Sequence, residues 1–231
     1  MDPTELKQAA LDSGSFPNVT ARRLRNVVIE CFAPRYLYGD RPPVAHLKAL
    51  APFISASDFS QILLLHTCRA NQILGDFVRE IYWPHYAGGQ MLFSNKEAKA
   101  FVTRAVDNGK TASRWSAATI HKVSGYLAGC CADFGLLERG RKSVRKLLSF
   151  HSSSAAIAYL TYDLHFSGLG DNALITHEDF QLFGMERADV VEELKRLALH
   201  GHVIVQAAGD IVRIGWKYPS MEALCDVLAQ G

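Results

Sequence analysis

One stretch decides the predicted fold: residues 116–146 read SAATIHKVSGYLAGCCADFGLLERGRKSVRK. The part from Ser116 to Phe134 is predicted to form a helix, because Ser116 is a good N-cap and apolar residues follow it at helical spacing. Gly135 is expected to end that helix. Leu136-Leu137 and the run from Val144 to Phe150 flank a polar turn, which predicts a small β-hairpin.

The segment before this stretch is predicted to be another helix. Ser94 followed by Glu97 is a capping-box pattern, and the helix is expected to run to about Asn108 and to end at Gly109. Residues 110–115 then form a short polar turn. The resulting order of helix, turn, helix and hairpin is that of a winged helix-turn-helix.

The rest of the chain is also predicted to be mostly helical. Before residue 94, proline and glycine separate candidate helices at 3–12, after Asn18 or Thr20, near 45–51, from Ser57 to about Leu74, and at 76–83 with Pro84 and Gly88-Gly89 as the stop. After residue 150, the candidates are a helix from Ser153 or Ser154 to Phe166, a short helix from Thr176, a helix at 186–200, a hairpin of 203–205 with 211–216, and a helix at 221–228.

The predicted fold class is therefore mostly α, with two winged-helix-like units that each carry a small β-hairpin. We expect an N-terminal helical region at 1–93, a central basic unit at 94–150 and an acidic C-terminal unit at 151–231. These boundaries can lie inside one compact fold. Hydrophobic residues make up 48% of the chain and charged residues 21%, which is typical of globular rather than disordered proteins.

Charge is distributed unevenly along the chain, although the formal net charge is only +2. The net charge is +1 over residues 1–93, +7 over 94–150 and −6 over 151–231. A basic middle of this kind indicates a polyanion-binding surface. The C-terminal unit is expected to be structural or to bind protein, because the carboxylates of its main helix would repel phosphates.

Cysteine usage and hydropathy predict a cytoplasmic protein that does not enter a membrane. The five cysteines include one adjacent pair and no C-x-x-C motif, which favours reduced thiols over disulfides or a zinc site. No apolar run approaches the roughly 18 residues that a membrane span requires. The acidic start at residues 1–5 does not have the pattern of a signal peptide.

The strongest candidate binding residues are cations in and around the predicted central hairpin. Five positive charges and no negative charge lie within residues 139–146, where they could contact the phosphates of a duplex. The preceding helix is expected to offer short polar and cationic groups to base edges. The predicted DNA-binding set is Lys110, Arg114, Ser116, Thr119, Lys122, Arg139, Arg141, Lys142, Arg145 and Lys146, with Arg22, Arg23 and Arg25 as secondary candidates.

Structural alternatives stay open for these residues. The basic turn could be a solvated loop that keeps an edge strand from pairing with another chain. The arginines at 22–25 could pack their stems on a helix surface. Tyr126 is expected opposite the apolar face of its helix, with Ser116, Thr119 and Lys122. Trp115 and Tyr126 are both predicted to be packed rather than stacked on bases.

No enzyme, metal site or cofactor is predicted. The sequence has no Gly-rich phosphate loop, no nucleophile elbow and no H-E-x-x-H motif. His200 and His202 have a spacing that a metal ion could use, but no acidic or thiol ligand lies nearby in the sequence.

The order of several weak motifs carries a family resemblance. Ser13-Gly14 and TARRLR at 20–25 come first, then Trp115-Ser116 before a helix that ends in FGLL at 134–137, then the basic hairpin, and last LALHGHVIVQ at 197–206 and GDIVRIGWKY at 209–218. In this order the chain resembles the BrxA family, a small component of BREX bacteriophage-defence systems. The resemblance implies a bacterial, mostly helical DNA-binding protein that works beside a methyltransferase, an ATPase and a phosphatase-like protein.

We therefore predict a non-catalytic protein that binds double-stranded DNA mainly through phosphates, with other BREX components as further partners. A homo-oligomer is an open alternative, formed through the acidic unit. RNA binding is a second alternative, because a basic helical surface also fits A-form backbones. A third is a protein-interaction scaffold whose basic middle meets an acidic protein.

Overall fold

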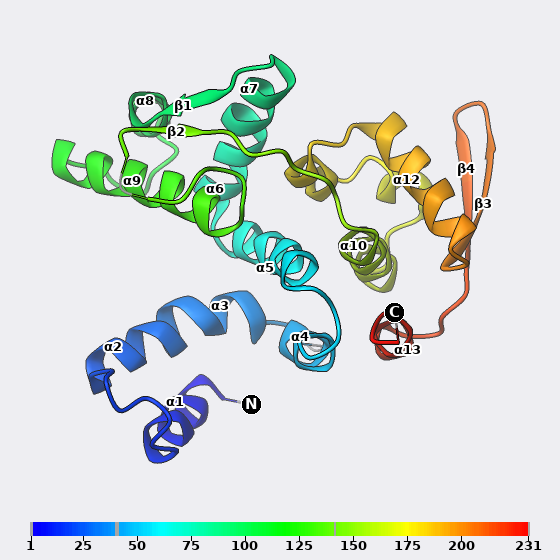
Figure 1. The fold of residues 1–231 in the computed structure, drawn as a ribbon, viewed down its shortest axis with the longest axis horizontal. Helices are drawn as coiled ribbons and strands as arrows, with labels where there is room; N and C mark the ends of the chain where they lie inside the picture. Colours follow the sequence, from blue (N-terminus) through cyan, green and yellow to red (C-terminus); the bar gives the residue numbers. More distant parts are fainter. Residues whose placement is uncertain (1, 40–41, 141, 231) are drawn as a thin grey trace.

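The computed structural model describes residues 2–39, 42–140 and 142–230 of the chain. These residues are mostly helical, with two small antiparallel strand pairs (Figure 1). The predicted mostly-α class is therefore confirmed.

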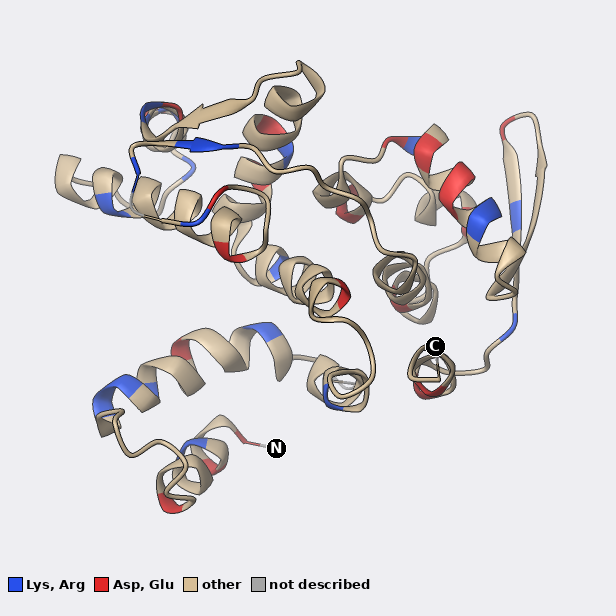
Figure 2. Cartoon of the chain, viewed as in Figure 1, with Lys and Arg blue, Asp and Glu red and all other residues tan. Residues whose placement is uncertain are grey.

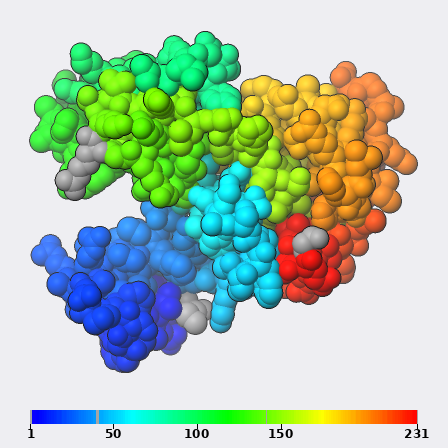
Figure 3. Space-filling view, in the orientation of Figure 1, coloured from blue at the N-terminus to red at the C-terminus, as the bar shows by residue number. Residues whose placement is uncertain are grey.

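The N-terminal helices are α1 (Pro3–Asp12) and a longer continuous helix. The longer helix consists of α2 (Ala21–Arg25), a π-helical segment η1 (Asn26–Phe32) and α3 (Ala33–Tyr36). Thr20 begins it, since its hydroxyl accepts a hydrogen bond from the Arg23 N–H at 3.2 Å. In the space-filling view these helices form a lobe that a groove separates from the rest of the molecule (Figure 3).

Two helices connect this lobe to the remainder of the fold. α4 (Pro43–Leu50) is followed by α5 (Ala56–Ala70). The N-cap of α5 is Ser55, which accepts from the Asp58 N–H at 3.1 Å, so the predicted start at Ser57 is wrong by two residues. Local sequence did not separate the two serines, because both precede the same apolar run.

The next helix passes through one of its two predicted stops and ends at the other. α6 (Gln72–Phe77), the π-helical segment η2 (Val78–Tyr82) and α7 (Trp83–Ala87) follow one another without a break. Pro84 closely follows the π-helical segment, where the regular α-helical hydrogen-bond pattern is already interrupted, so its missing N–H does not end the helix. The helix ends at Gly88, as the predicted Gly88-Gly89 stop indicates.

The central unit, residues 72–148, combines the helix 72–87 with a small sheet and the helices α8 and α9. β1 (Leu92–Ser94) leads into α8 (Asn95–Asp107), whose N-terminus has the predicted capping box of Ser94 and Glu97. α9 (Ala117–Asp133) begins at Ser116 as predicted, and β2 (Val144–Lys146) returns antiparallel to β1. The β1–β2 pair joins residues on both sides of the boundary predicted between 93 and 94.

The C-terminal unit, residues 154–228, carries the second strand pair. Its elements are α10 (Ser154–Phe166), α11 (Asp171–Leu174), a 3-10 helix η3 (Glu178–Phe183), α12 (Arg187–Leu199), β3 (Val203–Ala208), β4 (Ile211–Trp216) and α13 (Met221–Leu228). Ser153 is the N-cap of α10. The short helix predicted from Thr176 is η3, which His177 caps, and α11 had no counterpart in the prediction.

A buried ion-pair cluster joins α5 to the C-terminal unit. Arg69 of α5 donates to Asp163 of α10 at 2.6 Å and to Asp179 of η3 at 2.8 Å. The Asp179 side chain is only 5% exposed, so water screens this interaction weakly. The two carboxylates raise the pKa of Arg69 further above its usual value, although burial acts in the opposite direction.

A hydrogen-bonded chain beside this cluster extends to the N-terminal lobe. The ring of the fully buried His66 lies 3.0 Å from the hydroxyl of Tyr38 and 3.0 Å from that of Tyr159. Burial lowers the pKa of His66 to about 3, with smaller effects of Arg69 and His46 in the same direction. His66 is therefore neutral in the folded protein near pH 7.

We expect Arg69→Met to lower the free energy of unfolding by about 2–3 kcal/mol, because Asp163 loses its cation and the buried Asp179 keeps only the weaker contact with Arg79, at 3.7 Å. The matched control is Arg196→Met, whose ion pair with Glu193 is formed by an arginine that is 68% exposed. That exposed pair should contribute at most about 1 kcal/mol. Urea denaturation of both variants at neutral pH checks this, and equal losses would contradict it.

We expect stability to fall on mild acidification because of His66. The unfolded chain binds a proton at this residue below its ordinary pKa of 6.5, whereas the folded chain does not until about pH 3. The free energy of unfolding should therefore decrease by about 1.4 kcal/mol per pH unit as the pH falls through that window. Urea titrations at several pH values should give a shallower slope for His66→Gln, and unchanged slopes would exclude this source.

Candidate nucleic-acid interface

The exposed side of α9 has the polar and cationic character predicted for it. Ser116, Thr119 and Lys122 are all exposed, and α9 has no carboxylate before Asp133. The hydroxyl groups of Ser116 and Thr119 lie 3.0 Å apart, and Ser116 also caps the helix. The exposed Arg114 precedes this N-terminus, so a cation and the positive end of the helix dipole lie close together.

Tyr126 lies on the polar side of α9, as predicted, but it is less packed than expected because it is 60% exposed. The Lys122 ammonium lies 5.7 Å from the centre of its ring, within the range of a cation–π contact. Trp115, in contrast, is packed as predicted, against the core. The ring of Tyr126 is therefore part of the exposed surface of α9.

The basic segment after α9 is a loop between two short extended pieces. Leu137 forms a bridge with Leu147, and the N–H of Glu138 donates to the Lys146 carbonyl at 2.9 Å. The predicted hairpin is therefore present only as this bridge and its flanking hydrogen bonds, and the regular strand β2 pairs with β1 on the other side. Sequence alone did not predict β1, because three residues before a strong helix cap give too little pattern.

The cations of this loop are not equivalent. Arg139 and Lys142 are exposed, and Lys142 pairs with Glu138 at 3.0 Å. Lys146 is exposed but alternates with the buried Arg145, so it points to the outer face of the sheet. Arg141 lies outside the described residues. In Figure 2 the blue segments of this loop and of α9 lie in the same left-hand part of the molecule.

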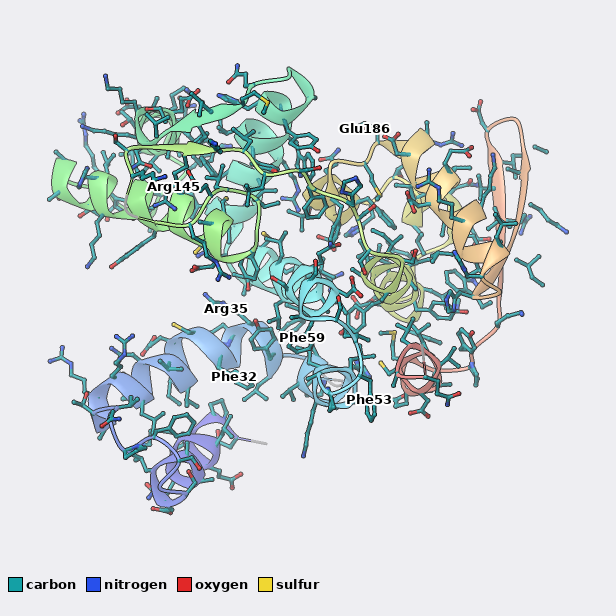
Figure 4. The ribbon with its side chains drawn as sticks, viewed as in Figure 1. Phe32, Arg35, Phe53, Phe59, Arg145 and Glu186 are labelled. Atoms are coloured by element: carbon teal, nitrogen blue, oxygen red, sulfur yellow. The ribbon has the colours of Figure 1, made fainter. Side chains whose placement is uncertain are left out.

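Arg145 is not placed as predicted. It was a leading candidate for a phosphate contact, but its side chain is only 8% exposed and it donates to the Ala128 carbonyl of α9 at 3.0 Å. Figure 4 shows it between β2 and α9. The strand alternation that exposes Val144 and Lys146 turns Arg145 inward. It therefore fastens the sheet to α9 and does not face an incoming duplex.

The remaining predicted cations lie at two other places. Lys110 is exposed but is held near acidic groups, 3.5 Å from Glu80 and 3.9 Å from Asp76. The secondary candidates lie on α2, in the N-terminal lobe: all three are exposed, and Arg25 pairs with Glu30 at 3.1 Å. The other two are Arg22 and Arg23.

The carboxylates of the C-terminal unit are largely engaged within the protein. On α12, Glu192 pairs with Lys195 at 2.7 Å and Glu193 pairs with Arg196 at 2.5 Å. Glu186 and Asp189 form the capping box of this helix. These ion pairs are formed with cations of the same unit, which its net charge of −6 already includes, so the unit keeps an acidic surface around α12.

Cys68 and Cys131 are buried and lie outside this surface. Burial raises the pKa of Cys68 to about 12 and that of Cys131 well above its usual value, so both thiols stay protonated. Among the described residues, no cluster of three or more His, Cys, Asp or Glu side chains is arranged to hold a metal ion. No helix in that part of the chain combines the length and apolarity needed to cross a membrane.

A family comparison gives one match. The model of the BrxA family matches residues 1–162, which is more than half of the chain. The match covers the N-terminal helices, the central unit and most of α10. The stretches at 197–206 and 209–218, which were part of the resemblance in the sequence, lie beyond the matched residues. The comparisons with curated proteins and with solved structures find no match.

We expect Arg145→Ala to destabilise the protein by about 1–3 kcal/mol, because it removes a buried hydrogen bond to the Ala128 carbonyl and the packing of the Arg145 side chain between β2 and α9. Lys146→Ala changes the neighbouring exposed residue and should alter stability by less than about 0.5 kcal/mol. Urea denaturation compares the two variants. Arg145 would be assigned to the surface after all if both variants were as stable as the unaltered protein.

Proposed function

The chain belongs to the BrxA family, and we propose that it is a non-catalytic, duplex DNA-binding component of a bacterial BREX phage-defence system. Membership of the family supports the BREX-associated role. The observation that carries the DNA-binding proposal is the exposed side of α9, which presents Lys122 and short hydroxyl groups and has no carboxylate before Asp133. Such a surface can approach phosphates without repulsion.

The order of elements in the central unit supports a winged-helix reading. The helix 72–87 is followed by β1, α8, α9, the extended residues 136–138, a basic loop and β2. We propose that α9 is the recognition helix and that the residues on both sides of Arg141, at 139–140 and 142–143, belong to the wing. The wing then contacts the phosphate backbone beside the groove that α9 enters.

Each predicted residue has a distinct role in this arrangement. Lys122 and Arg114 neutralise phosphates, and the first turn of α9 directs free N–H groups toward an anion. Tyr126 extends the contact surface. Arg145 supports the sheet from inside. The exposed Arg139 and Lys142 are placed to follow the backbone of the duplex, and contact by Lys146 stays a prediction.

Binding of this kind depends on salt more than on sequence. Phosphate contacts release condensed counterions, so affinity falls steeply as the salt concentration rises. A few hydroxyl groups on α9 give limited reading of base edges. We therefore propose a tolerant DNA binder, and the C-terminal unit, whose carboxylates are paired within the protein, serves to contact a protein partner.

We expect Arg114→Ala and Lys122→Ala each to weaken binding to an arbitrary DNA duplex and to reduce the salt dependence of affinity by about one phosphate contact. Lys195→Ala is the matched control, since Lys195 is an exposed lysine on a helix of the C-terminal unit. It should leave affinity unchanged. Fluorescence anisotropy at several salt concentrations measures all three variants.

The outcomes separate the proposal from its alternatives. The proposal is supported if the unaltered protein binds the DNA duplex and loses it only at high salt, and if Arg114→Ala and Lys122→Ala both lower the affinity. A matched RNA duplex that competes better than DNA would favour RNA binding. No binding even at low salt would favour a scaffold whose central unit meets an acidic protein.

A further inference from the structure

The rest of the chain covers one edge of the β3–β4 hairpin and leaves the other edge uncovered. The outer edge of β4 is covered: the Ile214 N–H donates to the Asp171 carboxylate at 3.0 Å. The Val212 N–H donates to the side-chain oxygen of Asn172 at 3.3 Å. Both acceptors belong to the short helix α11, which thus closes this edge to any further strand.

The edge of β3 is open. Val212 lies directly opposite Ala207, and Ile214 lies opposite Val205. In antiparallel pairs, directly opposite residues point their backbone groups either both inward or both outward. Because the N–H groups of Val212 and Ile214 point outward to α11, the backbone groups of Val205 and Ala207 point outward on the other side. Across the described ranges, neither residue forms a hydrogen bond there.

The β3 strand also lacks the features that usually protect an edge. Residues 203–208 read VIVQAA, with no charge, no proline and regular pairing along the whole strand. Natural edge strands are commonly protected by lysine, proline or a bulge. A neutral, regular strand of six residues is therefore available to pair with another strand.

The outer face of the hairpin adds an apolar surface next to the open edge. Ile204 of β3 is 56% exposed and Ile211 of β4 is 59% exposed. Ile204 lies opposite Gly215. A Cβ added at Gly215 would lie 3.2 Å from the Cβ of Ile204, so the isoleucine occupies the space beside the glycine. The single charged residue on this face is Arg213, and it lies on β4, away from the open edge.

We propose that a second copy of this chain pairs with the open edge, β3 against β3, antiparallel about a two-fold axis beside Val205. In this register Val205 faces its own counterpart, and Val203 faces Ala207 of the second copy. All of these residues point their backbone groups outward, so the strand is complementary to itself. The result is a four-stranded sheet across the dimer.

The second copy fits this edge better than an unrelated strand for two reasons. The pairing brings no like charges together, because residues 203–208 are uncharged and the Arg213 side chains stay on the distant strands. The hairpin also lies at an end of the molecule, far from the N-terminal lobe and the central unit, so two copies can meet there (Figure 1). This proposal does not depend on DNA binding.

The test measures self-association of the full chain without DNA. We expect sedimentation velocity to show a dimer whose fraction increases with protein concentration. Ala207→Pro removes an N–H that has no partner within the chain, so the monomer should keep its fold. The dimer should lose two hydrogen bonds and meet a steric block, and its dissociation constant should rise about tenfold or more.

A matched pair of lysine variants tests whether the two copies meet through the edge of β3 or through the outer face of the hairpin. Ile204→Lys and Ile211→Lys change equally exposed isoleucines on the same face, but only Ile204 lies on the pairing strand. We expect Ile204→Lys to weaken the dimer more. If Ile211→Lys abolished association while Ala207→Pro left it intact, the copies would meet through the face, and the edge assignment would be overturned.

Cross-linking tests the register directly. Ile204 of one copy lies opposite Gln206 of the other, in a pair whose side chains are close. The double variant Ile204→Cys/Gln206→Cys should form a disulfide-linked dimer on mild oxidation, above the background of the unaltered chain with its five cysteines. A protein that stays monomeric at high concentration and forms no such cross-link would overturn the proposal.

Discussion

The ion pairs of Arg69 hold the C-terminal unit on the rest of the fold. A guanidinium on α5 contacts carboxylates from α10 and η3, which are separated from it by about a hundred residues of chain. Removing these charges from water is costly, and the cost is offset only when all three groups are in place with good hydrogen-bond geometry. The cluster therefore favours one arrangement of the units over alternatives. His66, one residue earlier, extends the same junction toward the N-terminal lobe through Tyr38.

This junction also explains why regional net charge is a poor guide to the surface. The residues after 150 carry a formal charge of −6, yet Asp163 and Asp179 neutralise Arg69, and Asp171 caps a strand edge. Glu222 at the start of α13 contacts His46 at 3.4 Å, and the backbone and Ser220 hold its pKa at about 2. The acidic third thus supplies counter-charges for its own fold. The cations of α9 and of the loop after it have fewer carboxylates close by, so they define the basic surface.

The two strand pairs differ in which of their edges are covered, and this difference determines what each unit presents at its surface. In the central unit, β2 is covered by β1 on one side and by the residues around Leu137 on the other, so both edges of β2 are occupied. Its basic loop then projects beside α9. In the C-terminal unit, α11 covers one edge and leaves the other free. One unit therefore presents charge, whereas the other presents backbone hydrogen-bonding groups and isoleucine side chains.

The sequence by itself determined the local elements, because caps, helical periodicity and turn residues act within a few positions of the chain. Ser94, Ser116 and the hairpin turn at 209–210 were identified in this way, and Thr20 was one of two candidate caps, with Asn18. Only the tertiary structure decided which side chains of those elements reach solvent. Arg145 turned inward because β1 fixes the facing of β2, and Tyr126 turned outward because the buried side of α9 centres on Leu127 and Ala128. Burial depends on partners distant in sequence, and a local pattern cannot contain them.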